Sequence, residues 1–242
     1  MAQDIRLIAF DLDGTLTQHK SPLDAEHRAV LEELSKKYRL LMVGAGTCPR
    51  IFKQMGNFPI DIIGNYGMQY AEYDEASGEL VVKRQEQVTV DRDEMNRRAT
   101  VIREKYNLWD FAGDSMEFHP SGMLTFPVIG TKAVIEDKLA YDPDRSKRRV
   151  MYDFVKEVFF DHTVFIGGSS SFDICPDPYC KLYALDRYLE EHGLTREQVV
   201  YCGDDYRPGG NDHDVHESGI RFIEVDNYMD FERLIREAGL LD

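Results

Sequence analysis

The stretch Asp11-Leu12-Asp13-Gly14-Thr15-Leu16-Thr17 follows directly on an apolar run at residues 5–10. A short, nearly all-apolar run is typical of a strand buried on both faces of a parallel sheet. Ligands bind at the carboxyl ends of such strands, which is where the two carboxylates lie. One carboxylate can accept a phosphoryl group covalently, while its neighbour moves the proton of the leaving or attacking oxygen. The segment therefore indicates a phosphoryl-transfer enzyme.

The composition limits the partners of the chain. The 242 residues include 44 acidic and 29 basic ones, which gives a formal charge of −15. Phosphate backbones are bound by a surplus of lysine and arginine, so we expect no nucleic-acid partner. No apolar stretch approaches the roughly 20 residues of a membrane span, and residues 1–4 lack the start of a secretion signal. We expect no membrane association and a cytoplasmic protein.

The two ends of the chain share one pattern and the middle has another. Strands and helices alternate over residues 5–63 and again over residues 181–238, which predicts βαβ units around a parallel sheet. The middle instead mixes amphipathic helices with hairpin signals, which favours an α+β insert. The predicted fold is therefore α/β, with a Rossmann-like core at 1–82 and 179–242 and an α+β cap at 83–178.

Four segments fall at the ends of predicted sheet strands or in the loops beside them: Asp11 with Asp13, Thr47, Lys181 and residues 204–212. An Asp-Gly turn, a helix N-cap at Thr47, an ordinary lysine at a helix start and a solvated acidic turn could each explain one of them. Their agreement in position favours a shared site at the carboxyl edge of the sheet.

The chain resembles the haloacid-dehalogenase-like (HAD) superfamily in its branch with a large α+β cap, and most closely the eukaryotic-type phosphomannomutase family. The resemblance lies in the Asp-Leu-Asp-Gly-Thr-Leu-Thr start, in Gly122-Met123-Leu124, in the stretch from Gly167 to Asp173, and in Pro208-Gly209-Gly210-Asn211-Asp212. It covers essentially the whole chain.

The resemblance implies a role for each residue of the predicted site. Asp11 would be the nucleophile that forms an aspartyl-phosphate, and Asp13 the general acid/base. Thr47 and the amides up to Gly46 would bind the phosphate, and Lys181 would hold it against Asp11. The resemblance also implies Mg²⁺, held by Asp11, the Asp13 carbonyl and Asp204, with Asn211 or Asp212 binding the surrounding waters. Hard oxygen ligands beside a substrate phosphate suit this ion.

The cap departs from the family pattern where the family binds the phosphate that is not transferred. Where the family has arginines, this chain has His119, Thr131 with Lys132 adjacent, Lys138 and, in the loop after the first motif, Lys20. Ser171 and Asp173 remain as the family has them. Lysine lacks the planar two-point grip of arginine, so a weakened clamp would leave the aspartyl-phosphate open to water.

We therefore favour a sugar-phosphate phosphatase over the alternative, a phosphomannomutase-type mutase that would need a hexose 1,6-bisphosphate activator. A non-catalytic sugar-phosphate-binding protein is the third hypothesis, although every expected catalytic group is present. The family also implies a homodimer through the cap. Two questions stay open, whether Cys48 is reactive and whether His213 and His216 have a role beyond that of a solvated helix start.

Overall fold

The computed structural model describes residues 4–241. Residues 1–3, which made up most of the segment used to judge a secretion signal, lie outside the described residues. The described chain forms two compact units. The first unit comprises 4–85, Lys181–Arg207 and 212–241, and the second comprises Glu86–Cys180 and Pro208–Asn211.

A seven-stranded sheet forms the centre of the first unit, in the order β11-β10-β1-β2-β3-β4-β5. The five strands that run parallel are β11 (Arg221–Glu224), β10 (Val199–Gly203), β1 (Leu7–Phe10), β2 (Arg39–Val43) and β3 (Asp61–Gly64). The predicted α/β fold with a mainly parallel sheet is thus confirmed. The hairpin of β4 (Gln69–Asp74) and β5 (Glu79–Gln85) continues the sheet in antiparallel pairing.

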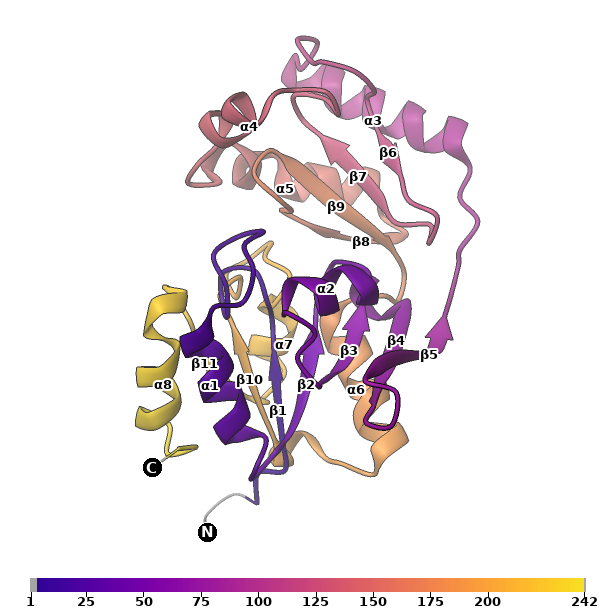
Figure 1. Cartoon of the computed structure of the whole chain (residues 1–242). Helices are drawn as coiled ribbons and strands as arrows, with labels where there is room; N and C mark the ends of the chain where they lie inside the picture. The colour runs from indigo at the N-terminus through magenta and orange to yellow at the C-terminus, as the bar shows by residue number, and fades with distance from the viewer. Residues whose placement is uncertain (1–3, 242) are drawn as a thin grey trace. The chain divides into compact units, whose positions relative to one another are not determined.

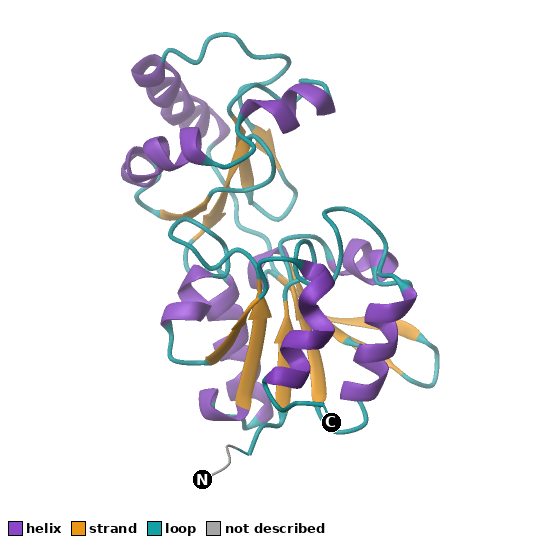
Figure 2. Cartoon of the chain, turned by 90° about the vertical axis from the view of Figure 1, so that its left-hand side faces the viewer, coloured by secondary structure: helices purple, strands orange, loops and turns teal. Residues whose placement is uncertain are grey.

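Helices cover both faces of this sheet, as Figures 1 and 2 show. Ile8 and Phe10 of β1 pack on the side of α1 (Ala25–Leu34), α2 (Cys48–Gln54) and α8 (Phe231–Glu237). Leu7 and Ala9 point to the other face, where α6 (Lys181–His192) and α7 (His213–Glu217) lie. Because successive side chains of a strand point to opposite faces, an all-apolar β1 fills both layers.

The second unit is built on a four-stranded antiparallel sheet in the order β6-β7-β9-β8. Its strands are β6 (Glu117–Phe118), β7 (Leu124–Pro127), β9 (Ser171–Pro176) and β8 (His162–Phe165). The helices α3 (Arg92–Tyr106) and α5 (Ser146–Val158) contribute Met95, Ala99, Ile102, Met151 and Val155 to the apolar cluster of this unit.

The structure also differs from the sequence analysis in several places. The units divide after Gln85 and Cys180, against the expected residues 82 and 178, because β5 keeps pairing with β4 through Gln85. Residues Pro208–Asn211, expected in the core, group with the second unit. The helix α4 (Ile135–Tyr141) was not predicted, and none of its residues is buried. Within residues 4–241, no helix is both long and apolar enough to cross a membrane.

Candidate active site

The first unit brings together a nucleophile candidate and an acidic neighbour by strand pairing. Asp11 follows β1, and its backbone N–H donates to the Cys202 carbonyl of β10 at 2.9 Å. Asp204 follows the last residue of β10. Because β1 and β10 are parallel neighbours, both carboxylates lie at the carboxyl edge of the sheet. The expected convergence of these two motifs is therefore what the pairing produces.

Lys181, the first residue of α6, is fully buried between two carboxylates. Its Nζ lies 2.9 Å from Asp11 Oδ1 and 2.8 Å from Asp212 Oδ1. Burial works against the charged form of Lys181, but Asp11 and Asp212 outweigh it and raise its pKa above the ordinary value. The ammonium is thus fixed as a cation beside the Asp11 carboxylate.

Three carboxylates, those of Asp11, Asp204 and Asp212, lie in the neighbourhood of this single ammonium. Burial raises the pKa of Asp11 to about 6, against the opposing effect of Lys181, and Asp212 adds to the rise. Burial together with Asp11 and Asp212 raises the pKa of Asp204 to about 8. Thr15 Oγ1 donates to Asp204 Oδ1 at 3.1 Å. The cluster therefore carries more negative charge than Lys181 neutralises, which favours the binding of a further cation.

The donor set fits Mg²⁺. Carboxylate oxygens of Asp11, Asp204 and Asp212 lie within 4.8 Å of one another, and hard oxygen ligands are those that Mg²⁺ prefers. A Cβ on Gly14 would lie 2.4 Å from Asp204 Oδ2, so only glycine lets the Asp204 carboxylate approach the backbone of the first motif. Asn211, which we expected near the ion, belongs to the segment that groups with the second unit.

Asp212 has a further role that the sequence analysis did not foresee. Its Oδ1 accepts hydrogen bonds from Lys181 Nζ at 2.8 Å and from the Tyr201 hydroxyl at 2.7 Å. Its Oδ2 accepts from the Asp205 backbone N–H at 3.1 Å. Asp212 is itself fully buried. It therefore holds the Lys181 ammonium in place, whatever it contributes to a bound ion.

The loop after β2 carries the predicted phosphate-binding group. Thr47 is exposed and is the N-cap of α2, where its Oγ1 accepts from the Arg50 backbone N–H at 3.4 Å. The Gly46 carbonyl accepts from the Asn65 backbone N–H at 2.8 Å, which fixes this loop against the end of β3. The N-cap role that competed with phosphate binding is thus present, and the two roles can coexist.

Asp13 is held by groups from two segments. Its Oδ1 accepts from the Lys20 backbone N–H and from Gln54 Nε2 of α2, both at 2.7 Å. Its Oδ2 lies 3.8 Å from Arg50 Nη2. Sequence reasoning missed Gln54 and Arg50, because nothing in a short helix pattern says which side chains turn toward a neighbouring loop. The contact described for Lys20 is made by its backbone N–H, and the binding of substrate by its side chain stays a prediction.

The cap candidates fall in the second unit. His119 Nε2 lies 3.0 Å from Thr125 Oγ1, and that hydroxyl donates to Asp173 Oδ1 at 3.5 Å. Pairing of β7 with β9 sets Thr125 opposite Asp173. Ser171 Oγ donates to the Gly167 carbonyl at 3.1 Å. The structure thus joins His119 and Asp173 through Thr125, a residue that the sequence analysis did not name.

The two lysines of the second unit are placed differently from each other. Lys138 Nζ donates to the Thr131 carbonyl at 3.2 Å, which brings together the two positions where the family has arginines. Lys132 is exposed, and its backbone N–H donates to the Ala112 carbonyl at 2.9 Å. Neither contact uses a carboxylate.

Cys48, His213 and His216 are each engaged by neighbouring groups. Burial raises the pKa of the Cys48 thiol to about 12, and its Sγ donates to the Ile62 carbonyl, so Cys48 is a protonated, inert thiol. His213 Nδ1 lies 2.9 Å from the Tyr206 carbonyl. Hydrogen bonds with Glu217 and Glu224 occupy both ring nitrogens of His216 and raise its pKa.

Comparison with known proteins agrees with this geometry. The family model for eukaryotic phosphomannomutase matches residues 27–233. The phosphomannomutase of Solanum lycopersicum is 30% identical over 229 residues, covering 90% of this chain and 87% of that protein. The phosphomannomutase of Saccharomyces cerevisiae is 26% identical over 220 residues, covering 86% and 84%.

Solved structures show the same fold at low sequence identity. The IMP-bound, N-terminally truncated IMP-nucleotidase of Plasmodium falciparum superposes with a TM-score of 0.69 at 14% identity, covering 99% of this chain and 69% of that one. A haloacid dehalogenase-like hydrolase from Bacteroides thetaiotaomicron gives a TM-score of 0.54 at 16% identity, covering 96% and 99%. The chain thus belongs to the eukaryotic phosphomannomutase family and is an enzyme of the haloacid-dehalogenase type.

Proposed function

We propose that the protein is a Mg²⁺-dependent sugar-phosphate mutase of the phosphomannomutase type, which works through an aspartyl-phosphate at Asp11. The observation that carries the proposal is the buried Lys181 ammonium, 2.9 Å from Asp11 and 2.8 Å from Asp212, in a chain matched to the family over residues 27–233. A carboxylate held against a fixed cation at the sheet edge is suited to accept a phosphoryl group.

The mutase is better supported than the phosphatase that the changed cap residues favoured. That preference rested on a few changed cations of the cap, whereas the likeness to phosphomannomutases extends over 86–90% of the chain in the relatives compared above. Lys132 and Lys138 also keep positive charge near the expected positions, although without the two-point grip of arginine. The balance therefore favours the mutase.

Residues of the first unit carry out the separate parts of the phosphoryl transfer. The Asp11 carboxylate attacks phosphorus while Asp13 gives a proton to the departing sugar oxygen. Lys181 and Thr47 bind the phosphoryl oxygens as charge spreads over them. A bound Mg²⁺, held by Asp11, Asp204 and the Asp13 carbonyl, would neutralise the phosphate charge. A hexose 1,6-bisphosphate would supply the phosphoryl group that first loads Asp11, as a mutase requires.

A phosphatase is the second candidate because of what the buried arginines of the second unit do. Arg103 donates to the Leu108, Ser115, Pro127 and Val128 carbonyls. Arg148 pairs with Asp142 and donates to the Gly167, Gly168 and Ser171 carbonyls. Both guanidinium groups are used by contacts within the second unit. Neither therefore replaces the arginines with which the family binds the phosphate that is not transferred, and a sugar bisphosphate would be bound more weakly.

One experiment tests the proposal and separates the two candidates. Mannose 1-phosphate is incubated with the protein, Mg²⁺ and a trace of hexose 1,6-bisphosphate, and the products are separated. A mutase forms hexose 6-phosphate, whereas a phosphatase releases inorganic phosphate in equal amount to the sugar consumed. Asp11→Asn should abolish either reaction, and Asp226→Asn, a change at an exposed residue of the same unit, should leave it unchanged. Full activity in Asp11→Asn would refute the aspartyl-phosphate.

A further inference from the structure

The side-chain amide of Gln54 connects α2 to the segment that follows the first motif. Its Nε2 lies 2.7 Å from Asp13 Oδ1, 3.1 Å from the Ser21 carbonyl and 3.3 Å from Thr17 Oγ1. Its Oε1 accepts from Arg50 Nη1 at 3.3 Å. The shortest of these four contacts is the one to the carboxylate, and hydrogen bonds to ionised acceptors are the stronger ones.

The contacts of Asp13 distinguish its two oxygens. Oδ1 accepts two hydrogen bonds of 2.7 Å, from Gln54 Nε2 and from the Lys20 backbone N–H. A carboxylate oxygen has two lone-pair sites, so these two donors fill it. Oδ2 lies 3.8 Å from Arg50 Nη2, which is beyond hydrogen-bonding distance. Oδ2 is therefore the oxygen that can hold a proton and pass it on.

We propose that Gln54 is a positioning residue that fixes Asp13 with Oδ2 as its only proton-transferring oxygen. The inference rests on the proposed function. In the first half-reaction an Asp11 oxygen bonds to phosphorus, the bond from phosphorus to the sugar oxygen breaks, and that oxygen takes the proton of Asp13 Oδ2. In the second, the acceptor hydroxyl gives its proton to Oδ2 while its oxygen displaces the Asp11 carboxylate from phosphorus.

A purely structural role for Gln54 makes a different prediction. The contacts with Ser21 and Thr17 would also attach the loop that follows the first motif to α2. If that loop became mobile, phosphoryl transfer from every donor would slow by a similar factor. A misplaced acid slows only those donors whose leaving oxygen needs a proton. Sugar alkoxides are poor leaving groups and need one, whereas 4-nitrophenolate departs without it. The dependence on leaving group therefore separates the two roles.

The test compares single turnovers of a hexose 1,6-bisphosphate and 4-nitrophenyl phosphate in the wild-type protein, Gln54→Met and Lys53→Met, with the enzyme in excess and Mg²⁺ present. Lys53 is an exposed residue of the same helix and serves as the matched control. For Gln54→Met we expect transfer from the hexose 1,6-bisphosphate to fall about 10- to 100-fold, the cost of a misplaced reacting group. Release of 4-nitrophenol should change less than about threefold, since its departure needs no proton. Lys53→Met should match the wild type with both donors.

A second measurement shows whether the site stays intact. Beryllium fluoride with Mg²⁺ occupies the phosphoryl position on Asp11 without a leaving group, so its stabilisation of the protein should be equal in Gln54→Met and wild type. If Gln54→Met does not fold, Gln54→Glu, which keeps the side-chain length but loses the donor, takes its place. Equal losses with both donors, or no loss with either, would overturn the inference. A wild-type protein that transfers from neither donor would instead overturn the proposed function, and this inference with it.

Discussion

Lys181 shows how a single buried charge organises the site. A lysine is rarely buried without a partner, because removing an unpaired ammonium from water costs several kcal/mol. Here Asp11 and Asp212 each lie within 2.9 Å of its Nζ. From the family resemblance we expect Lys181 to hold a phosphate against Asp11. The structure adds that Asp212 keeps the ammonium at that place before any phosphate arrives.

Tyr201 supports this arrangement from the middle of β10. Its hydroxyl donates to Asp212 Oδ1 at 2.7 Å, and the whole residue is buried. We predict that Tyr201→Phe lowers the free energy of unfolding by about 1.5–3 kcal/mol, the usual worth of a hydrogen bond to a charged group. The loss of activity should be much smaller than the loss of stability, because Lys181 still pairs with Asp212. Urea unfolding and steady-state assays measure the two effects.

Tyr188→Phe is the control for that prediction. Tyr188 is equally buried in the same unit, but its hydroxyl lies 3.4 Å from Asp61 and away from Lys181. The two substitutions remove the same atom, so a similar loss of stability but a larger loss of activity for Tyr201→Phe would mean that the hydroxyl takes part in more than holding Asp212.

Sequence alone could predict part of the site for a physical reason. The ends of parallel strands meet at one edge, so the positions of Asp11 and Asp204 follow once the strands are recognised. Tyr201 and Gln54 could not be predicted in this way. Tyr201 lies in an apolar strand, as core residues do, and Gln54 has the polar side chain of an ordinary helix surface. Their contacts depend on side-chain packing between elements distant in sequence.

Among the elements, those with an apolar stripe and clear ends were predicted best. The helix α6 lies at the start of residues 181–238, where helices and strands were expected to alternate, and Gly193 follows it with a φ of 63°, as a helix-ending glycine often does. The helix α4 was missed because no residue of it is buried, so there was no stripe to detect. Pairing of the β4–β5 hairpin with β3 was likewise beyond a local pattern, since it joins the hairpin to the parallel sheet.

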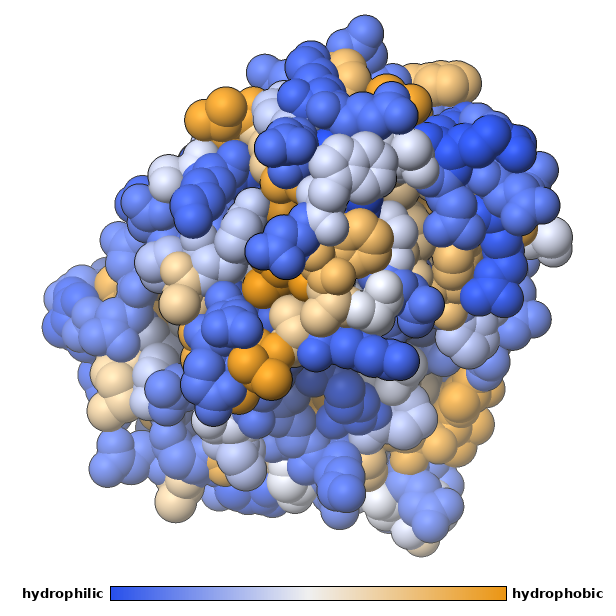
Figure 3. All heavy atoms as spheres, turned by 90° about the horizontal axis from the view of Figure 1, so that it is seen from above, coloured by the Kyte–Doolittle hydropathy of each residue, from blue (hydrophilic) through white to orange (hydrophobic). Residues whose placement is uncertain are grey.

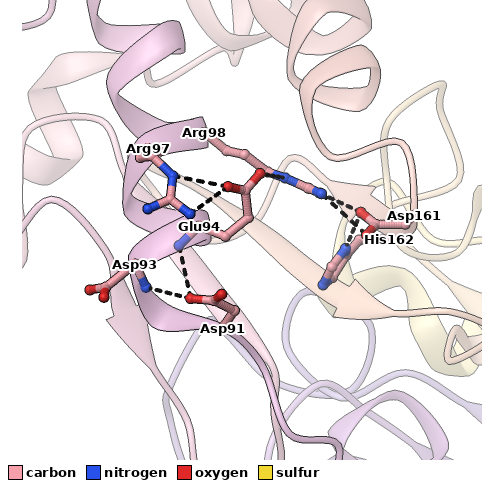
Figure 4. Close-up of polar contacts among 7 residues, drawn as sticks. All are labelled: Asp91, Asp93, Glu94, Arg97, Arg98, Asp161 and His162. Atoms are coloured by element: carbon pink, nitrogen blue, oxygen red, sulfur yellow. Dashed lines mark hydrogen bonds and ion pairs between the residues drawn. The ribbon is translucent and has the colours of Figure 1, made fainter.

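The start of α3 illustrates which charges join elements and which do not (Figure 4). Asp91 accepts from the Asp93 and Glu94 backbone N–H groups, an N-cap arrangement. Arg97 pairs with Glu94 inside the helix, whereas Arg98 pairs with Glu94 and also reaches Asp161 beside β8. Exposed pairs within a helix contribute little to stability, so the position of α3 depends more on its buried side.

Arg103 is the residue that fixes the buried side of α3. Its guanidinium donates to Ser115 Oγ and to four backbone carbonyls and lies 3.8 Å from the ring centre of Phe111. We predict that Arg103→Met destabilises the second unit by at least about 3 kcal/mol, because it leaves several buried carbonyls without a donor. Hydrogen exchange of α3 and β7 should report the loss.

The matched control on the same helix is Arg97→Met. Arg97 is exposed and pairs only with Glu94 among the contacts described for it, so we expect a change within about 0.5 kcal/mol. Equal effects of the two substitutions would mean that the buried network of Arg103 does not stabilise the unit.

Negative charge is in excess over the protein, but only a small part of it is buried. The formal charge is −15, and the face drawn in Figure 3 is largely hydrophilic, with apolar residues in separate groups. Many of the acidic side chains are exposed to solvent, and their charge does not require a bound ligand. The exception is the cluster of Asp11, Asp204 and Asp212, in which Asp11 and Asp212 are buried and Asp204 is half-buried, so that its negative charge is costly to leave without a cation. A bound cation should act on the stability of the unit that contains this cluster.

We predict that Mg²⁺ stabilises the first unit and leaves the second unchanged. All three carboxylates belong to the first unit, and an ion that binds only the folded state at 100 times its Kd adds about 2.7 kcal/mol. Hydrogen exchange with and without Mg²⁺ should show added protection in β1 and β10 but none in α3. Asp204→Asn should remove most of this response, since it takes one charge from a site that binds through charge. Added protection in α3 that equals that of β1 would show that the two units unfold as one, and no added protection anywhere would mean that Mg²⁺ does not bind at Asp11 and Asp204.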